Sequence, residues 1–165
     1  FTLSYALPIT PEFKLNLDFY GNVLLEMIEK NTAANEKENR LGTVASMSNY
    51  DGALAKFRFM TNLAFSGSFW KFSNRIRFIS PVEVFNWDNG TKEDDTDDMP
   101  KKDVPAVAYW DLSALIMWKG LDFIVGMDNV LDKDPPYIPT GNANSNNNTY
   151  DWMGRYVYTK IGYQF

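Results

Sequence analysis

The sequence predicts an all-β fold, a transmembrane antiparallel β-barrel to which this chain contributes seven strands. Three observations predict it: apolar and polar residues alternate in seven segments, short and long connections alternate between them, and 16% of the 165 residues are aromatic. Aromatic and β-branched side chains favour strands. Short turns at one end and long loops at the other are typical of transmembrane barrels. The seven predicted strands are 1–9, 15–27, 56–65, 70–78, 108–118, 121–127 and 157–165.

The segment 56–65 shows the alternation most clearly. Phe57, Phe59 and Leu63 fall on one face of a strand, while Arg58 and Asn62 fall on the other. Segment 70–78 follows after a tight turn at Ser66-Gly67 and alternates in the same way, with Asn74 as the one polar residue on its apolar face. The two segments are therefore predicted to form a long hairpin.

The connections divide into two kinds. Short ones lie at 10–13, 66–67 and 119–120, and long polar ones lie at 31–54, 81–105 and 133–153. No apolar run approaches the ~20 residues that a membrane-spanning helix needs. Trp70, Trp118, Tyr163 and Phe165 all fall near the short-turn end, where an interfacial aromatic girdle is expected.

A soluble β-sandwich or lipocalin-like barrel would alternate in the same way, with its apolar face turned inward. Basic residues on two adjacent segments argue for the membrane. Crowded like charge suits the wet interior of a large barrel better than a soluble exterior. These residues are Lys56, Arg58, Lys71, Arg75 and Arg77.

Composition excludes several classes of function. The net charge of −5 argues against a nucleic-acid partner. The chain has no Cys and no His, so it lacks thiolate nucleophiles, an imidazole base and the commonest transition-metal ligand. We therefore expect no enzyme activity, no cofactor and no metal. The acidic run 93–98 could offer oxygen ligands to Ca²⁺, but it lacks EF-hand spacing, and a solvated loop is the favoured interpretation.

The last third of the chain resembles the C-terminal region of TonB-dependent receptors. The resemblance rests on Asp111-Leu112-Ser113 opening one strand and on the run 125–133, Val-Gly-Met-Asp-Asn-Val-Leu-Asp-Lys, closing the next. Asp134-Pro135-Pro136, Tyr150-Asp151, Gly154-Arg155 and the end Tyr163-Gln164-Phe165 follow in the family's order. Val130 and Leu131 stand where the family usually has Leu-Phe.

The resemblance implies the last seven strands of a barrel of about 22 strands in the outer membrane of a Gram-negative bacterium. Residues 1–165 would form the C-terminal part of that barrel, while the plug domain and earlier strands would lie outside this chain. The family's activity is active uptake of a scarce ligand: a ferric siderophore, a cobalamin-like chelate or a glycan. The implied partners are the rest of the receptor, the TonB complex acting through the plug, the barrel-assembly machinery and outer-membrane lipid.

Two sets of residues follow as candidate sites. Aromatic residues of the long loops, together with two residues that face the barrel interior, could line the mouth for a ligand: Trp87, Tyr109, Asp111, Tyr137, Tyr150 and Trp152. The last strand resembles the signal that the barrel-assembly machinery recognises, through Val157, Ile161, Tyr163 and Phe165. Asn129 and Asp132 are expected to end a strand by bonding to local backbone. A complete eight-stranded porin-like or structural barrel remains the alternative.

Overall fold

The structure is a computed structural model that describes residues 1–31, 36–45, 52–85, 103–138 and 145–163. These residues form an all-β fold with twelve strands in three sheets. Within these ranges, no helix has the length and apolarity needed to cross a membrane.

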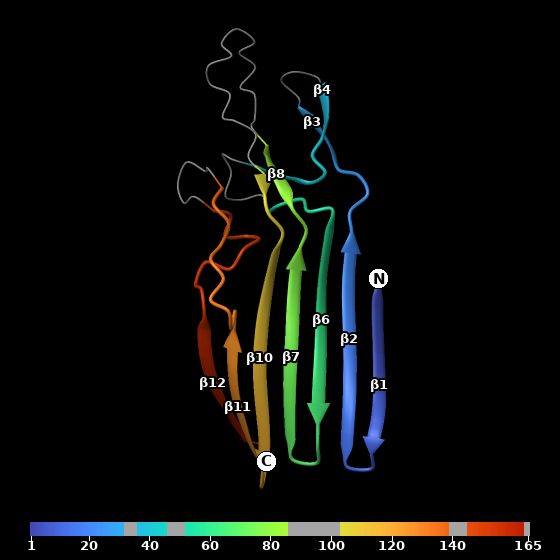
Figure 1. Ribbon diagram of the computed structural model, residues 1–165, viewed down its shortest axis with the longest axis vertical. Helices are drawn as coiled ribbons and strands as arrows, with labels where there is room; N and C mark the ends of the chain where they lie inside the picture. Colours follow the sequence, from blue (N-terminus) through green and yellow to red (C-terminus); the bar gives the residue numbers. More distant parts are fainter. Residues whose placement is uncertain (32–35, 46–51, 86–102, 139–144, 164–165) are drawn as a thin grey trace.

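The largest sheet is a seven-stranded antiparallel meander (Figure 1). In spatial order its strands are β1 (Thr2–Thr10), β2 (Phe13–Val23), β6 (Phe57–Ser66), β7 (Trp70–Ile79), β10 (Val107–Trp118), β11 (Leu121–Asp128) and β12 (Tyr156–Tyr163). The seven predicted strands are thus confirmed, although β2 ends at Val23 and does not continue to Met27. Every neighbouring pair is antiparallel, so β1 and β12 run in the same direction.

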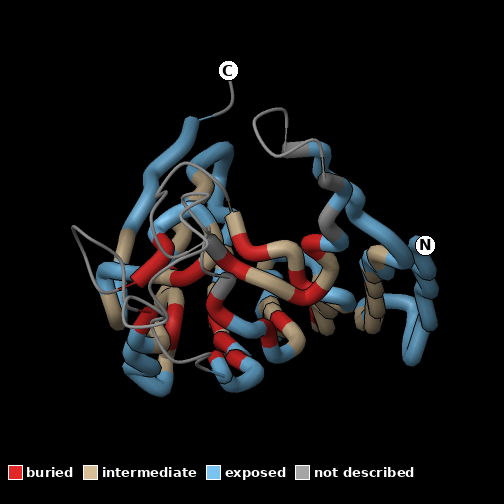
Figure 2. Tube along the Cα trace, turned by 90° about the horizontal axis from the view of Figure 1, so that it is seen from above, coloured by how far each residue is buried: buried red, intermediate tan, exposed pale blue. Residues whose placement is uncertain are grey.

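The sheet is an open arc. β1 pairs only with β2 and β12 only with β11 among the described strands, so no pairing closes a barrel. Viewed from above, the chain curves from the edge near the N-terminus around to the edge that leads to the C-terminus (Figure 2). Both outer strands therefore carry an edge whose backbone groups lack a strand partner.

The short turns are confirmed at one end of the sheet. Lys119 and Gly120 join β10 to β11 with φ values of 48° and 82°. Positive φ at both central residues is typical of the type I′ turn, whose twist matches that of a hairpin. The connection from β6 to β7 has one residue more and is closed by the Gly67 amide, which donates to the Trp70 carbonyl oxygen at 2.9 Å.

The long connections contain five strands that the sequence analysis did not predict. β3 (Ile28–Asn31) and β4 (Glu36–Asn39) form a hairpin, and β5 (Thr43–Ala45), β8 (Val82–Phe85) and β9 (Asp103–Val104) form a small mixed sheet. Strands of two to four residues are too short to show a period-two pattern. In the small sheet, Val44, Val82, Val84 and Val104 are buried in one core with residues of the main sheet.

The buried core lies at the loop end of the molecule. It combines the small sheet with the loop ends of β7 and β10 and with four residues outside the strands, Ala53, Ala55, Ile138 and Tyr150. Ile79, Val107 and Tyr109 belong to the same face of the main sheet as Arg75 and Arg77, because all are cross-strand partners or alternate with them. The polar face is therefore the inner side of the arc, where the buried residues gather in Figure 2.

The opposite face of the main sheet is apolar and open to solvent. Its exposed side chains include Leu3, Ile116 and Ile161, which are 59%, 50% and 74% exposed. Monomeric soluble proteins rarely expose contiguous apolar patches of this extent. The soluble alternative, in which the apolar face is turned inward, is thus not the arrangement of the described sheet.

Aromatic rings border this apolar face at both ends. Toward the loops, Phe59 stacks on Phe19 and Phe78, with ring centroids 5.5 and 5.0 Å apart. Toward the short turns, the Phe13 ring lies 5.8 Å from that of Trp70, and Trp118 and Tyr163 lie at the same end, with Leu121 facing both. The predicted placement of Trp70, Trp118 and Tyr163 near the turns is confirmed, whereas Phe165 lies outside the described residues.

Asn74 is the polar exception on the apolar face, and its side chain accepts a hydrogen bond. The indole N–H of Trp110, on the neighbouring strand β10, donates to the Asn74 Oδ1 atom. The bond gives the Trp110 indole its acceptor and the Asn74 carbonyl oxygen a donor.

Candidate functional site

On the inner face of the main sheet, cross-strand partners of neighbouring strands form rows that run across the strands, which we call rungs. One rung is polar: Asp18 faces Asn62, Asn62 faces Arg75, and Arg75 faces Asp111. The next rung toward the short turns consists of small residues on four adjacent strands, Ala64, Ser73, Ser113 and Gly126, and ends at Tyr158. The rung above the polar one contains Met60, Arg77 and Tyr109.

Asp111 is the centre of an ion-pair network. Its side chain is 3% exposed, and it accepts hydrogen bonds from Arg75 Nε and Arg77 Nε, each at 2.8 Å from Oδ2. Arg77 Nη2 and the Asn129 amide donate to Oδ1 at 3.0 and 2.9 Å. A buried carboxylate is tolerable only with partners of this kind, because isolated burial of a charge is very costly.

Two further carboxylates complete the network. Arg75 Nη2 lies 3.2 Å from Asp128 Oδ1. Arg77 makes a bidentate pair with Asp151, at 3.0 Å from Nη1 and 2.6 Å from Nη2. Three carboxylates thus surround two guanidinium groups, and the network joins strands β7, β10 and β11 to the loop before β12.

The Tyr109 ring packs against the guanidinium group of Arg77. The guanidinium carbon of Arg77 lies 5.0 Å from the centre of the Tyr109 ring, a cation–π arrangement. The Asp151 amide donates to the Tyr109 hydroxyl at 3.1 Å. Arg77 is therefore held by its aromatic neighbour as well as by its two carboxylates.

Asn129 closes the strand β11, as the sequence predicts. Its φ is 51°, its Nδ2 donates to the Lys133 carbonyl oxygen, and its Oδ1 accepts from the Lys133 amide, both at 2.9 Å. Asp132, at φ 54°, accepts from the Arg155 amide at 2.8 Å. The Asp-Asn-Val-Leu-Asp-Lys run thus forms the turn that sets the start of β12.

Replacing Asn129 with alanine is expected to cost about 2–3 kcal/mol of stability. Asn129 is fully buried, so the variant leaves the Lys133 amide and carbonyl groups without partners, at about 1–3 kcal/mol for each unsatisfied group. Chemical unfolding of the refolded protein, followed by circular dichroism, measures the loss. Asp134→Ala, at an exposed position of the same loop, is the control and should change stability by less than about 0.5 kcal/mol. Equal losses in both variants would contradict the assigned role.

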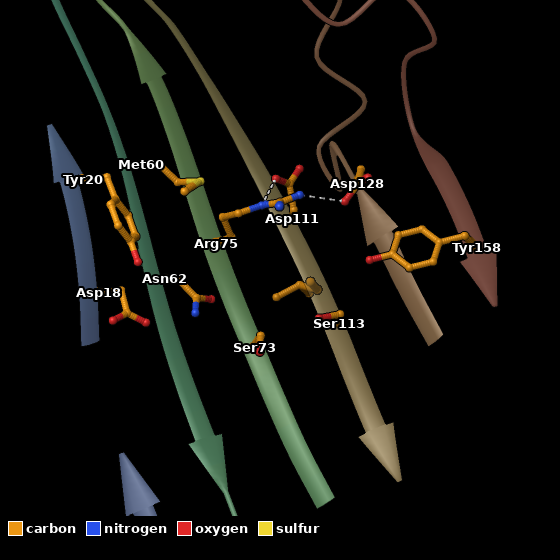
Figure 3. Close-up of a pocket in the computed structure, with 11 residues that line it drawn as sticks. Asp18, Tyr20, Met60, Asn62, Ser73, Arg75, Asp111, Ser113, Asp128 and Tyr158 are labelled. Atoms are coloured by element: carbon orange, nitrogen blue, oxygen red, sulfur yellow. Dashed lines mark hydrogen bonds and ion pairs between the residues drawn. The ribbon is translucent and has the colours of Figure 1, made fainter. Parts of the chain in front are cut away.

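A groove of about 340 Å³ lies on the inner face next to the ion-pair network (Figure 3). Of the small-residue rung, Ser73 and Ser113 line the groove, while Tyr158 covers Gly126. Larger side chains follow in the next rung toward the short turns, which consists of Lys71, Leu115, Ile124 and Lys160. Figure 3 shows Tyr20 and Asp18 at one end and Tyr158 at the other, with Asn62, Ser73 and Ser113 between them.

Gly126 explains the position of Tyr158. A Cβ atom on Gly126 would lie 2.2 Å from the Tyr158 ring, so only glycine lets that ring lie flat across β11. In Figure 3 the Tyr158 hydroxyl points into the groove. An aromatic ring laid over a glycine on the facing strand is a known means of stabilising a strand pair.

The predicted mouth residues are not brought together as one site. Asp111 and Tyr109 belong to the ion-pair network, and Tyr150 lies in the core, where burial raises its pKa to about 12. Tyr137 and Trp152 are 55% and 45% exposed. Trp87 lies outside the described residues, as does the acidic run 93–98. A role of these residues in ligand binding stays a prediction.

Of the residues that line the groove, the sequence analysis named Asp111 as a candidate site residue and missed the others. Asp18, Asn62 and Ser73 each belong to the polar side of a predicted strand, but only strand register shows that they meet. Of the predicted assembly signal, Val157, Ile161 and Tyr163 lie exposed on the apolar face, and Phe165 is outside the described residues.

In the described residues, no group of three or more acidic side chains is arranged to hold a metal ion. The site therefore consists of a closed ion-pair network and an open polar groove beside it. No protein-family model, no curated protein and no solved structure matches this chain.

Proposed function

We propose that this chain forms part of the barrel wall and the outer loops of a TonB-dependent receptor in a bacterial outer membrane. The receptor would import a scarce ligand, a ferric siderophore or similar chelate, or a glycan, when TonB acts on a plug domain supplied by the rest of the protein. This chain would contribute binding surface and no chemistry.

The two-faced sheet is the observation that carries the proposal. One face exposes apolar side chains between two aromatic borders, and the other holds charged and polar residues with a groove. On the apolar face of β6, Phe57 lies beside Phe59 of the loop-end border and Phe65 lies beside Phe13 of the turn-end border. The two residues are eight apart, about 26 Å along the strand at ~3.3 Å per residue. At a tilt of about 35–45° this length rises about 18–21 Å, most of the ~25 Å apolar band of outer-membrane barrels.

The residues of the family resemblance support the same proposal. Asp111, Asn129, Asp132 and Arg155 are connected at the loop end. The Asn129 amide donates to Asp111, the Asp132 amide to the Asn129 carbonyl oxygen, and the Arg155 amide to Asp132. The alternative of a complete eight-stranded barrel needs one more strand between β12 and β1. The described residues provide seven strands in this sheet, so the larger barrel is the proposal we make.

Labelling of single cysteines tests the membrane placement, and the chain is suited to it because it has no native Cys. Leu131→Cys places a thiol at the loop end, and Ser68→Cys places one in a short turn; both positions are exposed. In intact cells, a membrane-impermeant maleimide should label Leu131→Cys, and should label Ser68→Cys only after the outer membrane is permeabilised. Equal labelling of both in intact cells would contradict the proposal.

Dependence on TonB tests the transport part separately. Cells that produce the full receptor should accumulate its ligand when TonB is present and lose that uptake when TonB is removed. Uptake that persists without TonB, from a receptor that passes the labelling test, would point to a passive channel instead.

A further inference from the structure

We infer that the outer face of β7 around Asn74 is the contact surface for a second copy of the receptor, so that two copies form a two-fold dimer in the membrane. The inference rests on the proposed function, which places the apolar face of the main sheet in lipid. Its starting point is the Asn74 side chain. The carbonyl oxygen accepts from the Trp110 indole, but the NH₂ group has two donors, and within the described part of the chain no hydrogen bond engages them.

Asn74 lies at the middle of the apolar band. On β7 it is four residues from Phe78 of the loop-end border and four from Trp70 of the turn-end border. That separation is about 13 Å along the strand, and about 9–11 Å along the membrane normal at a tilt of about 35–45°. The side chain of Asn is short, so it cannot extend to either interface as Lys or Arg can. Lipid chains offer no acceptor at this depth, and the two N–H groups therefore need one from another polypeptide.

The position of β7 in the sheet excludes the rest of the same receptor as the source of that acceptor. β7 is the middle strand of the main sheet, with three strands on each side of it (Figure 1). In the proposed receptor, further strands continue the wall from the edges at β1 and β12, and the plug lies on the inner side. Neither part covers the outer face of β7, so the acceptor must come from a separate molecule in the membrane.

The chemistry of the amide selects a second copy of the same chain. A primary amide is complementary to itself, because its N–H group can donate to the carbonyl oxygen of another amide that donates in return. The Asn74 Oδ1 atom has two lone pairs, so it can accept from a second amide and keep the bond from Trp110. All copies insert in the same orientation, and a two-fold axis parallel to the membrane normal places both Asn74 side chains at one depth. The same patch then serves both copies, as in any two-fold interface.

The side chains around Asn74 suit such a contact. Leu63 and Leu112, its cross-strand partners on β6 and β10, are apolar and half-buried. Thr61, two residues before Leu63 and on the same face, adds a hydroxyl group to the patch. Polar side chains that bond across an otherwise apolar contact associate proteins within membranes. A two-fold axis at Asn74 brings the Leu63 side of one copy against the Leu112 side of the other.

Cross-linking in native outer membranes tests the dimer. Two differently tagged copies of the full receptor, each without other cysteines, are produced in the same cells, one with Leu63→Cys and the other with Leu112→Cys. A short bismaleimide should join them into a product that carries both tags, resolved by denaturing electrophoresis. Val157→Cys in both copies is the control for random collision, because Val157 lies in the same row of cross-strand partners, three strands from Asn74. These copies should not be joined.

Two further variants of the full receptor separate association from folding. Asn74→Leu removes the amide and keeps the size of the side chain. It should weaken dimerisation about tenfold, the effect of losing two hydrogen bonds in a membrane, while the protein still inserts. Trp110→Phe is the matched control: it removes the bond within one copy but keeps the amide, and should leave the dimer intact. Energy transfer between two labelled copies in lipid vesicles measures both variants.

Several results would overturn the inference. They are a receptor that stays monomeric, a dimer that Asn74→Leu leaves unchanged, a link from Leu63→Cys to a different protein, and equal cross-linking of Val157→Cys. The cysteine labelling above decides the membrane placement independently. If Leu131→Cys and Ser68→Cys are labelled from opposite sides of the membrane and no dimer forms, the dimer is wrong and the proposed function stands.

Discussion

Replacing Asp111 with alanine is expected to cost about 3–5 kcal/mol, the range for removing one partner of a buried ion pair. The variant leaves Arg75, Arg77 and the Asn129 amide without their shared acceptor. The loss should appear as a lower unfolding temperature and as weaker attachment of the loop that carries Asp151. Thermal unfolding in detergent and limited proteolysis of that loop measure the two effects.

Asp128→Ala is the matched control for this prediction. Asp128 is a third exposed and makes one contact with Arg75, at 3.2 Å, so its loss should cost about 1 kcal/mol or less. If the two variants were equally destabilised, Asp111 would not be the centre of the network.

Leu17→Arg is expected to lower folding into a membrane by about 2–4 kcal/mol. Leu17 lies on the apolar face of β2, opposite Leu63 and midway between the two aromatic borders. Arginine on the lipid face near the bilayer midplane carries a cost of this size. The fraction of protein that folds into lipid vesicles, resolved by its heat-modifiable mobility in electrophoresis, measures the loss.

Asn16→Arg is the control, because Asn16 is the neighbouring residue and faces the inner side. There the arginine can remain in water and should change folding by less than about 1 kcal/mol. A larger loss of folding for Asn16→Arg than for Leu17→Arg would mean that the polar face, and not the apolar face, is the one buried away from water. That result would contradict the membrane placement.

The strands of the main sheet could be predicted because their evidence is local. In β6, for example, Phe57, Phe59 and Leu63 alternate with Arg58 and Asn62 within ten residues. This local alternation is enough to predict the strand and its two faces. The turn at Lys119-Gly120 is equally local. The same reasoning fails for β5 and β9, with three and two residues, whose order depends on partners more than twenty residues away in the sequence.

The site was harder to predict because its residues are brought together by strand register. The sequence places Arg75 and Arg77 on a crowded basic face, and the structure shows that Asp111, 34 residues after Arg77, forms ion pairs with both. The connection between β7 and β10 is long, and its length does not determine the register of the two strands. That Arg75 and Asp111 are cross-strand partners therefore could not be derived from their spacing in the sequence. The groove has the same origin, since Asp18, Asn62, Ser73 and Ser113 lie on four different strands and come together only through strand register.

The common direction of β1 and β12 limits how this sheet can be completed. An arc of seven antiparallel strands cannot join its own edges, or the opposite edges of two copies, without placing two strands side by side in parallel. A fully antiparallel ring must contain an even number of strands, so it can include this arc only by adding an odd number of others. Fifteen further strands, the number a 22-stranded barrel would need, meet this condition.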